Sequence, residues 1–265
     1  MFIDSHAHID GPEFDEDRDA VIRRAFEAGV TAILNVGTGD PHSGSLERAV
    51  ETAEKYEAIY TAIGTHPHDA RFFNSEAERR IDSLLRQSSH VIAWGEIGLD
   101  FHYDNSPRET QKEVFRRQLA LARTAGLPVI VHTREAEDET IRILRSEWAA
   151  SGLPGIMHCF SGSQSLAEEA LDLGFYMSFA GIVTFKKADD LRAVAKAAPL
   201  ARLLIETDCP YLAPIPYRGK RNEPAYVVEV ARCLAELRGV TLAEIGRITT
   251  ENFERVFGLD LTTRP

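Results

Sequence analysis

The chain has 265 residues, of which 44% are hydrophobic, and its formal net charge is −11. This size and composition are those of a globular protein that buries a core without disulfide staples, and single α/β barrel domains commonly have this length. The acidic balance weighs against a protein that holds duplex DNA with a broad basic surface, although bound divalent cations reverse the local field at a site.

Cysteine usage and hydropathy indicate the compartment. The three cysteines, Cys159, Cys209 and Cys233, have no paired spacing, which favours a reducing compartment over a disulfide framework. No apolar run reaches the length that spans a bilayer, and the chain enters a predicted strand at once without a basic leader. We therefore expect a cytoplasmic protein with no membrane association and no obligate protein partner.

Apolar runs typical of buried β-strands recur along most of the chain, separated by amphipathic stretches typical of helices. Eight runs are predicted as strands, at residues 2–9, 32–36, 59–63, 91–97, 129–131, 155–157, 175–178 and 203–205. Strands that alternate with helices indicate a parallel sheet, because parallel neighbours need a crossover connection.

Eight strands with helices between them predict a (β/α)8 TIM barrel that spans residues 1–265 as a single domain. An open doubly wound sheet is the alternative, which is less favourable because no glycine-rich phosphate loop follows the first predicted strand. Residues 241–257 add a helical pattern after the eighth strand, where Thr241 and Glu244 have capping-box spacing. We therefore expect an extra C-terminal helix packed outside the barrel.

The first predicted strand carries two histidines on one face. Side chains two apart in a strand point to the same side, so His6 and His8 face the same way, with Asp4 behind them. Two neutral imidazoles placed in this way can bind one divalent cation. Because two histidines also occur in one strand by chance, the prediction needs ligands from elsewhere in the chain.

Imidazoles and carboxylates stand at the ends of four further predicted strands. Glu96 lies at the end of the fourth strand, and His132, His158 and Asp208 follow the fifth, sixth and eighth. In a barrel these ends converge on one mouth, where catalytic residues lie. Each residue alone has a simpler explanation as a hydrogen-bonded loop residue or a helix cap. Their joint occurrence predicts a metal site.

The predicted ligands outnumber what one tetrahedral cation needs, which favours two divalent cations per chain. We assign His6, His8 and Asp208 to one cation and His132 and His158 to the other. Glu96 is the carboxylate predicted to bridge the two cations. Histidines suit Zn²⁺ or Mn²⁺, whereas carboxylates also admit Mg²⁺, so the sequence leaves the metal open.

Further polar residues are candidates for holding a substrate. His66 and His68 follow the third predicted strand, Arg134 follows the fifth, and Arg218 begins a basic run at 218–221. Beside a metal site these side chains would bind an anion such as phosphate, and elsewhere they would be ordinary surface residues. Glu206 follows the eighth strand and would hold a further cation, position water or orient a ligand.

Nine short motifs carry a resemblance to a known family. In chain order they are DSHAH at 4–8, GTHPH at 64–68, GEIGLD at 95–100, VHTR at 131–134, HCFSG at 158–162, SFAGIVTF at 178–185, ETDCPY at 206–211, RGKRNEP at 218–224 and NF at 252–253. The chain is similar in these motifs to the TatD family of metal-dependent hydrolases, often called TatD deoxyribonucleases. Thr65 stands where the family leads us to expect an aliphatic residue, which concerns loop packing more than chemistry.

The resemblance implies a TIM barrel with a divalent-metal centre at the six predicted ligands. It also implies hydrolysis of phosphodiester bonds in DNA, commonly from a 3′ end, so we expect single-stranded or damaged DNA as the substrate. Water activated at the metal would attack phosphorus, and Asp208, or less favourably Glu206, would accept its proton. The other candidates would hold the phosphate: His66, His68, Arg134 and Arg218.

Two other functions are open. An amidohydrolase-like enzyme acting on a small phosphoester, lactone or amide would use the same ligands, although the basic run and paired histidines favour a phosphate. A non-catalytic metal-binding barrel is the third hypothesis, and the full ligand set argues against it. Cleavage of a diester that requires metal and stops with a chelator would separate these hypotheses.

Overall fold

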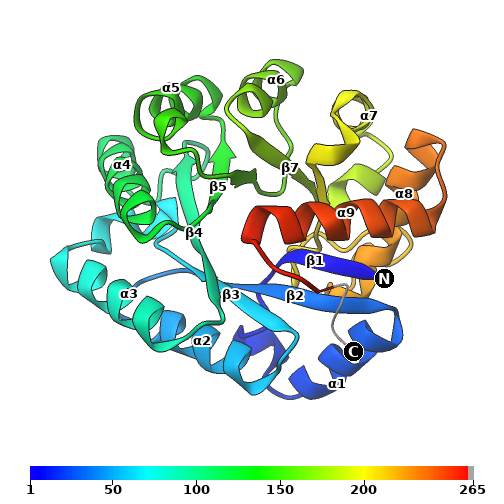
Figure 1. The fold of residues 1–265 in the computed structure, drawn as a ribbon, viewed down its shortest axis with the longest axis horizontal. Helices are drawn as coiled ribbons and strands as arrows, with labels where there is room; N and C mark the ends of the chain where they lie inside the picture. The colour runs from blue at the N-terminus through cyan, green and yellow to red at the C-terminus, as the bar shows by residue number, and fades with distance from the viewer. Residues whose placement is uncertain (262–265) are drawn as a thin grey trace. The chain divides into compact units, whose positions relative to one another are not determined.

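The computed structural model describes residues 1–261, in which eight β-strands form a single sheet (Figure 1). The strands are β1 Phe2–Ala7, β2 Val30–Gly37, β3 Ile59–Ile63, β4 Val91–Asp100, β5 Val129–Arg134, β6 Gly155–Met157, β7 Phe175–Phe179 and β8 Leu203–Ile205. Their order in the sheet follows their order in the sequence. The pairs β1–β2, β3–β4, β4–β5, β5–β6 and β7–β8 are parallel.

An α-helix follows each strand, and α1 to α7 supply the crossovers that parallel neighbours require. The helices are α1 Arg18–Glu27, α2 Ser45–Lys55, α3 Ser75–Gln87, α4 Arg108–Ala125, α5 Glu137–Glu147, α6 Gln164–Asp172, α7 Asp189–Ala197, α8 Val227–Arg238 and α9 Leu242–Phe257. Short 3₁₀ helices lie in the connections: η1 Pro12–Phe14, η2 Pro67–Phe72, η3 Ala149–Ser151, η4 Gly181–Thr184, η5 Leu200–Arg202 and η6 Pro224–Tyr226. Eight β/α units in sequential sheet order are the topology of a (β/α)8 barrel, so the predicted fold class is confirmed.

The predicted extra helix is α9, which follows the eighth β/α unit. Thr241 is its N-cap residue, and the Thr241 hydroxyl accepts the backbone N–H of Glu244 at 3.2 Å. The Glu244 carboxylate in turn accepts the backbone N–H of Thr241 at 2.8 Å, which completes the capping box. This reciprocal pair satisfies two backbone donors that the first turn of a helix leaves without an intrahelical partner.

Strand boundaries match the prediction where the apolar run ends with the strand, as in β3, β6 and β8. Other boundaries differ from the prediction: β2 extends over Val30–Gly37, β7 ends one residue later at Phe179, and β1 ends two residues earlier at Ala7. At their C-terminal ends β4 continues beyond Ile97 to Asp100, and β5 continues through His132 to Arg134. The two extensions pair with each other, with Gly98 opposite His132 and Asp100 opposite Arg134. Glycine and aspartate are depleted in strands, so the predicted strands ended before the observed ones do. Glu96 therefore lies inside its strand and not at the end.

Several strands bury ionisable side chains along with their apolar ones. Every residue of β1, β3 and β4 is buried, which is typical of parallel strands covered on both faces. The polar residues buried in β1 and β4 include Asp4, His6, Glu96 and Asp100. Burial of an ionisable group is costly unless the group is paired, so these buried side chains indicate a functional site.

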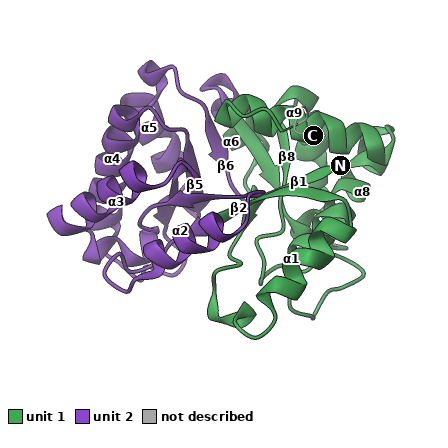
Figure 2. Cartoon of the chain, turned by 60° about the horizontal axis from the view of Figure 1, so that its bottom comes forward, with its two compact units in different colours: residues 1–35, 159–167, 176–265 green, residues 36–158, 168–175 purple. Residues whose placement is uncertain are grey.

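The chain divides into two compact units, which Figure 2 colours separately. Unit 1 comprises residues 1–35, 159–167 and the chain from 176 onward, and unit 2 comprises 36–158 and 168–175. Within unit 1, β1 lies beside β8, and α9 packs on both strands and on α8 (Figure 1). Within unit 2, β4 lies between β3 and β5 and contacts α4. A single domain over 1–265, of which 262–265 lie outside the described residues, stays a prediction.

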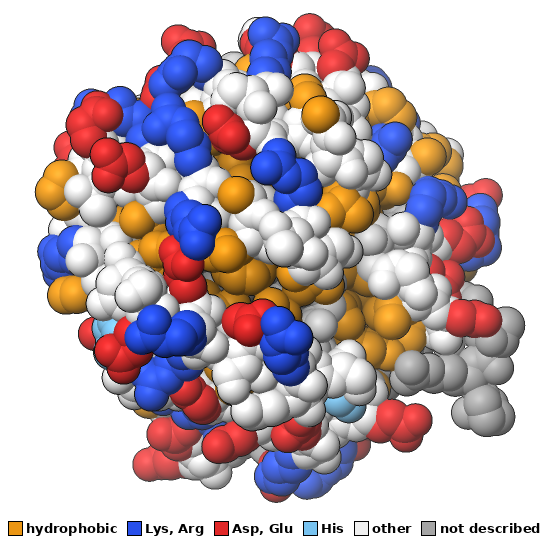
Figure 3. All heavy atoms as spheres, turned by 60° about the vertical axis from the view of Figure 1, so that its left-hand side comes forward, with side chains coloured by type: hydrophobic (Ala, Val, Ile, Leu, Met, Phe, Trp, Pro, Cys, Tyr) orange, Lys and Arg blue, Asp and Glu red, His pale blue; other side chains and the backbone are white. Residues whose placement is uncertain are grey.

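Acidic and basic side chains are mixed on the face drawn in Figure 3. Ion pairs between and within helices of the described chain include Arg117 with Glu78 at 2.6 Å and Arg86 with Asp82 at 3.0 Å. That face therefore offers no uniform positive field for a duplex. Within residues 1–261, no helix is both long and apolar enough to cross a bilayer.

Candidate metal centre

The end of β1 brings two imidazoles to the carboxylate of Asp208 in unit 1. The Nε2 atoms of His6 and His8 lie 3.3 Å apart. The Oδ1 atom of Asp208 lies 3.4 Å from Nε2 of His8 and 3.9 Å from Nε2 of His6. Ligands about 2.1 Å from a tetrahedral cation stand roughly 3.4 Å from one another. The spacing of these three atoms therefore fits one shared cation, as predicted for this set.

Asp208 is held in place through the strand that carries the histidines. The buried carboxylate of Asp4 accepts the backbone N–H of Thr207 at 2.8 Å and the Thr207 hydroxyl at 2.5 Å. The backbone N–H of Asp208 donates to the carbonyl of His6 at 2.9 Å. Burial raises the pKa of Asp4 well above its ordinary value, although the Thr207 hydrogen bonds oppose this. Asp4 thus joins β1 to the loop after β8.

The backbone of Asp208 adopts a conformation that few side chains tolerate. Its φ is +56°, in the left-handed region, where aspartate is more common than most non-glycine residues. The side-chain amide of Asn222 donates to the carbonyls of Thr207 at 2.8 Å and Tyr211 at 2.6 Å, on either side of Asp208. Strained residues persist only where surrounding bonds fix them, and they concentrate at functional sites.

A second cluster in unit 2 surrounds the carboxylate of Glu96 with imidazoles. Its Oε1 atom lies 2.9 Å from Nδ1 of His132 and 3.4 Å from Nε2 of both His66 and His158. The Glu96 side chain is almost fully buried. Burial alone would raise the pKa of Glu96, but the neighbouring His158, His66 and His132 outweigh it and hold the pKa well below its ordinary value. Glu96 is therefore an ionised carboxylate in a buried site.

His132 lies between two carboxylates. Its Nε2 atom lies 3.1 Å from Oδ2 of Asp100, and its Nδ1 atom faces Glu96. The same Asp100 oxygen lies 3.0 Å from Nε2 of His68. Burial tends to lower the pKa of His132, but the bonds to Asp100 and Glu96 raise it overall. Two buried carboxylates around one ring form a site that attracts positive charge, whether a proton or a metal.

His66 lies within the second ligand cluster, although the sequence analysis proposed it for substrate binding. One ligand atom from each of His66, Glu96 and His132 lies within 4.8 Å of the other two. Burial lowers the pKa of His66 to about 4, which outweighs the opposing effect of Glu96. The ring is therefore neutral at pH 7, which is the form that binds a metal.

Asp100 is a site residue that the sequence analysis did not assign. Its buried carboxylate contacts His68 and His132, and it also accepts the backbone N–H of Tyr103 at 2.9 Å. Burial would raise the pKa of Asp100, but these bonds keep it well below its ordinary value. The missed signal was the alternation Glu96, Gly98, Asp100, which places both carboxylates on one face of a continuing strand.

Two buried glutamines of α4 hold the backbone on which the second cluster depends. Gln118 accepts the backbone N–H of Thr65 at 2.8 Å and donates to its carbonyl at 2.9 Å, directly before His66. Gln111 does the same for Asp100, at 2.8 and 3.0 Å. The two glutamines are seven residues apart and so lie on the same face of α4. One helix therefore positions the ends of β3 and β4.

The remaining predicted residues lie outside the two clusters of ligand atoms: Arg134 ends β5, His68 lies in η2, and Glu206 and Arg218 lie in the loop after β8. Glu206 is fully buried in unit 1, where its carboxylate accepts the backbone N–H of Cys159 at 2.8 Å. The guanidinium of Arg134 lies 4.8 Å from the ring centre of Tyr103 in unit 2. In the basic run, Arg221 pairs with Asp17 at 2.7 Å, so it serves the structure of unit 1.

The donor chemistry of both clusters fits divalent cations. Imidazole nitrogens with carboxylate oxygens suit Zn²⁺ or Mn²⁺, and the carboxylates also admit Mg²⁺. In unit 1 the set is His6, His8 and Asp208, and in unit 2 it includes His66, Glu96 and His132. The structure thus assembles the predicted ligands of unit 1 as one group. In unit 2 it places Glu96, His132 and His158 together and adds His66.

Comparison with known sequences gives a family and named relatives. A family model described as TatD related DNase matches residues 3–258. The uncharacterized metal-dependent hydrolase YabD of Bacillus subtilis (strain 168) is 48% identical over 260 residues, covering 98% of this chain and 100% of that protein. The 3'-5' ssDNA/RNA exonuclease TatD of Klebsiella pneumoniae (strain 342) is 35% identical over 264 residues, covering 97% of this chain and 98% of that protein.

Comparison with solved structures agrees with the sequence relatives. The crystal structure of YJJV, a TatD homolog from Escherichia coli K12, matches with a TM-score of 0.90 and 33% identity. The match covers 98% of this chain and 98% of that one. Both the sequence and the fold are therefore similar over nearly the whole length.

Proposed function

The chain belongs to the TatD related DNase family and is a metal-dependent hydrolase, and from this premise we propose that it cleaves phosphodiester bonds of single-stranded DNA from the 3′ end. The observation that carries the proposal is the pair of imidazole and carboxylate clusters built on strand ends, one in each unit. A relative of 35% identity is named as an exonuclease on single-stranded DNA and RNA, which supports the same reaction class.

We propose that each cluster holds one divalent cation. His6, His8 and Asp208 would hold one, and Glu96, His132 and His158, with His66 beside them, would hold the other. The chemistry such cations supply is to lower the pKa of bound water and to polarise a phosphoryl oxygen. A bridging role for Glu96 stays a prediction, as does the identity of the metal.

Asp208 is the carboxylate best suited to accept a proton during hydrolysis. Its side chain is 14% exposed, whereas Glu206 is fully buried. Glu206 also accepts the backbone N–H of Cys159, so we assign it to positioning the loop that begins there. A general base must reach the proton that it removes, which favours the more accessible Asp208.

The substrate phosphate would be held by cationic and imidazole side chains. Arg134 is exposed at the end of β5, two residues after His132, and its guanidinium rests on Tyr103. His68 contacts Asp100 through Nε2, and its side chain is 28% exposed, so a ligand can reach the ring. A planar guanidinium binds two phosphate oxygens at once, which orients the ester for attack. Arg218 belongs to unit 1, and its predicted contact with a substrate phosphate stays a prediction of its own.

The test compares Asp208→Asn and His132→Ala with the wild type on single-stranded DNA labelled at the 3′ or the 5′ end. With Mg²⁺, Mn²⁺ or Zn²⁺ supplied, we expect each variant to lose about 10²- to 10⁴-fold in kcat/KM while keeping its fold. His42→Ala, an exposed histidine outside both clusters, is the matched control and should cleave like the wild type. Near-wild-type turnover of either variant would contradict the mechanism.

The same preparation separates the alternative substrates. A panel of a small phosphoester, a lactone and an amide is assayed with each metal beside the labelled DNA. Faster turnover of one of these compounds than of DNA would favour the amidohydrolase-like alternative.

A further inference from the structure

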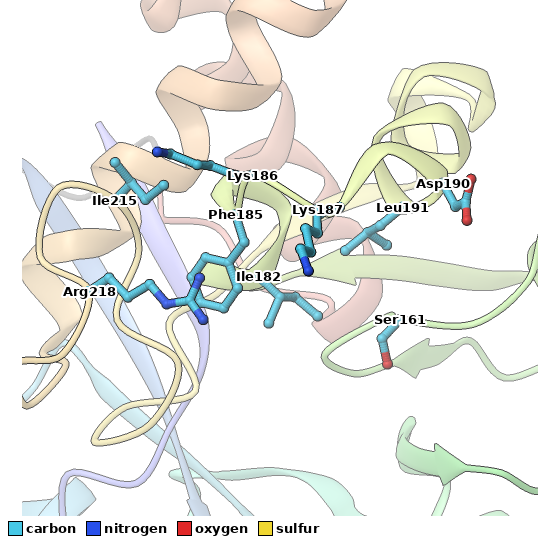
Figure 4. A pocket seen from close by; sticks show the side chains of 10 residues that line it. Ser161, Ile182, Phe185, Lys186, Lys187, Asp190, Leu191, Ile215 and Arg218 are labelled. Carbon is cyan, nitrogen blue, oxygen red and sulfur yellow. The ribbon is translucent and has the colours of Figure 1, made fainter.

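Unit 1 contains a hollow of about 710 Å³ at the C-terminal ends of its strands (Figure 4). Its walls come from the segment between β7 and α7, from the first turn of α7 and from the loop after β8, with Ser161 from the segment after β6. The lining side chains that matter here are Ile182, Phe185, Lys186, Lys187, Ile215 and Arg218. We call this site the basic hollow.

The basic hollow lies at the same edge of the sheet as the first ligand cluster. β7 and β8 are parallel, so the segments after them emerge at one edge. Asp208 and Arg218 belong to the same loop, between β8 and η6. In (β/α)8 folds, the loops at this edge carry substrate-binding residues. A ligand in the basic hollow is therefore bound by the same loop that presents Asp208.

Three cations surround the basic hollow without carboxylate partners. Within residues 1–261, Lys186, Lys187 and Arg218 form no ion pair, and all three are exposed. Asp190 is the acidic residue of the lining, and Figure 4 shows its carboxylate turned away from the three cations. In a chain of net charge −11, such a grouping of unpaired cations indicates an anionic ligand.

The walls of the basic hollow are held by hydrogen bonds. Arg192 donates to the carbonyl of Phe185 at 2.7 Å, directly before the two lysines. The Thr184 hydroxyl accepts the backbone N–H of Ile215 at 2.9 Å, which joins one wall to the other. Because these hydrogen bonds already fix the backbone of the walls, little conformational entropy is lost when a ligand binds.

The shape and chemistry of the basic hollow match a nucleotide strand better than a lone phosphate. The apolar side chains of Phe185, Ile182 and Ile215 provide a surface for a base, and the Arg218 guanidinium lies 4.1 Å from the Phe185 ring centre. In Figure 4, Arg218 extends toward Phe185, Lys187 extends toward Ile182, and Lys186 extends away toward Ile215. Cations that point in different directions suit successive phosphates.

We propose that the basic hollow binds single-stranded nucleic acid beyond the cleaved nucleotide, holding one base and the adjoining phosphates. This inference rests on the proposed function and adds a place where strand length is sensed. It assigns Lys186 and Lys187 as specificity residues that favour longer strands over dinucleotides.

The test measures dissociation constants of the metal-loaded protein for fluorescent phosphorothioate DNA, as a dinucleotide and as a strand of about eight nucleotides. In the wild type the longer strand should bind more tightly. In Lys186→Ala/Lys187→Ala we expect the ratio between the two constants to fall about tenfold, and the salt slope for the longer strand to become shallower by about 1.4. An unchanged ratio in this variant would overturn the proposal.

The matched control is Arg23→Ala/Lys196→Ala, which removes two exposed cations of unit 1 outside the basic hollow. This control should keep the wild-type ratio of the two dissociation constants. If the ratio falls as much as in Lys186→Ala/Lys187→Ala, the effect is one of general charge and the proposal is overturned. Inorganic phosphate serves as a competitor. Displacement of the longer strand by stoichiometric phosphate would identify a free-phosphate site and would also overturn it.

The two proposals fail in different ways. If the metal-loaded wild type cleaves no phosphodiester, the proposed function fails. If it cleaves DNA but Lys186→Ala/Lys187→Ala keeps the wild-type ratio of dissociation constants, only the proposal for the basic hollow is overturned.

Discussion

Gly98 occupies a position where a side chain would collide with the neighbouring strand. Its φ is +141°, and a Cβ atom there would lie 2.0 Å from the carbonyl oxygen of His132. Because glycine adopts this conformation and leaves room, β4 and β5 stay paired beyond Glu96. That pairing places His132 between Glu96 and Asp100. At this scale one glycine determines the geometry of three ionisable groups.

Asp100→Asn tests whether the second carboxylate supports metal binding. The substitution keeps the shape but removes the charge that faces His132 and His68. We expect metal affinity and kcat to fall about 10- to 100-fold, as for other residues that orient ligand histidines. Metal titration by calorimetry, with a parallel unfolding curve, measures this. Asp104→Asn, in an exposed pair with Arg108, is the control, and equal metal affinities of the two variants would contradict the role.

At the scale of whole elements, buried amide side chains connect helices to the strand ends. Gln111 and Gln118 of α4 bind the backbones of Asp100 and Thr65 in unit 2. In unit 1, Asn252 of α9 donates to the carbonyl of Leu203, where β8 begins, at 2.9 Å. Amides suit this purpose because they satisfy both backbone donors and acceptors without adding charge. The helices therefore orient the strands as well as cover them.

Gln118→Leu tests this support. It leaves the N–H and C=O of Thr65 and the indole N–H of Trp94 without their partner, so we expect a loss of about 1–3 kcal/mol in the free energy of unfolding. Urea denaturation measures the loss. Gln87→Leu, at an exposed position of α3, is the control and should lie within about 0.5 kcal/mol of the wild type. If the free energy of unfolding of Gln118→Leu also lies within about 0.5 kcal/mol of the wild type, these hydrogen bonds do not stabilise the fold.

At the scale of the whole molecule, metal binding at the proposed first cluster would be coupled to folding. His6 and Asp208 are distant in the sequence, and only the fold brings their ligand atoms within 3.9 Å. The unfolded chain therefore presents no comparable site, and a cation that binds the folded form stabilises it. The net charge of −11 adds to this effect, because a bound cation reduces the repulsion among acidic groups.

Added metal should therefore raise the unfolding temperature. At a hundredfold excess over the dissociation constant, we expect about 2.7 kcal/mol of stabilisation, or roughly 5–10 °C. Scanning calorimetry with and without a chelator measures the shift. His6→Ala/His8→Ala should lose much of it, whereas the exposed His42→Ala should keep it. An equal shift in all three proteins would place the metal outside the first cluster.

The sequence by itself determined the fold class and the types of ligand. Apolar runs at strand spacing, with helices between them, are local patterns, and β3, β6 and β8 were predicted to the residue. The two-residue repeat of His6 and His8 is local as well. The motifs also indicated the family, which the comparison confirmed from residue 3 to 258. Cytoplasmic location stays a prediction.

Only the tertiary structure decided which groups meet. The place of Asp100 beside His132, and of His66 beside Glu96, depends on strand register and on a close approach at Gly98. The basic hollow depends on the packing of two loops that are distant in the sequence. Periodicity reports which face a residue occupies within its own element, but pairing between elements arises from packing across the chain, which no local pattern contains.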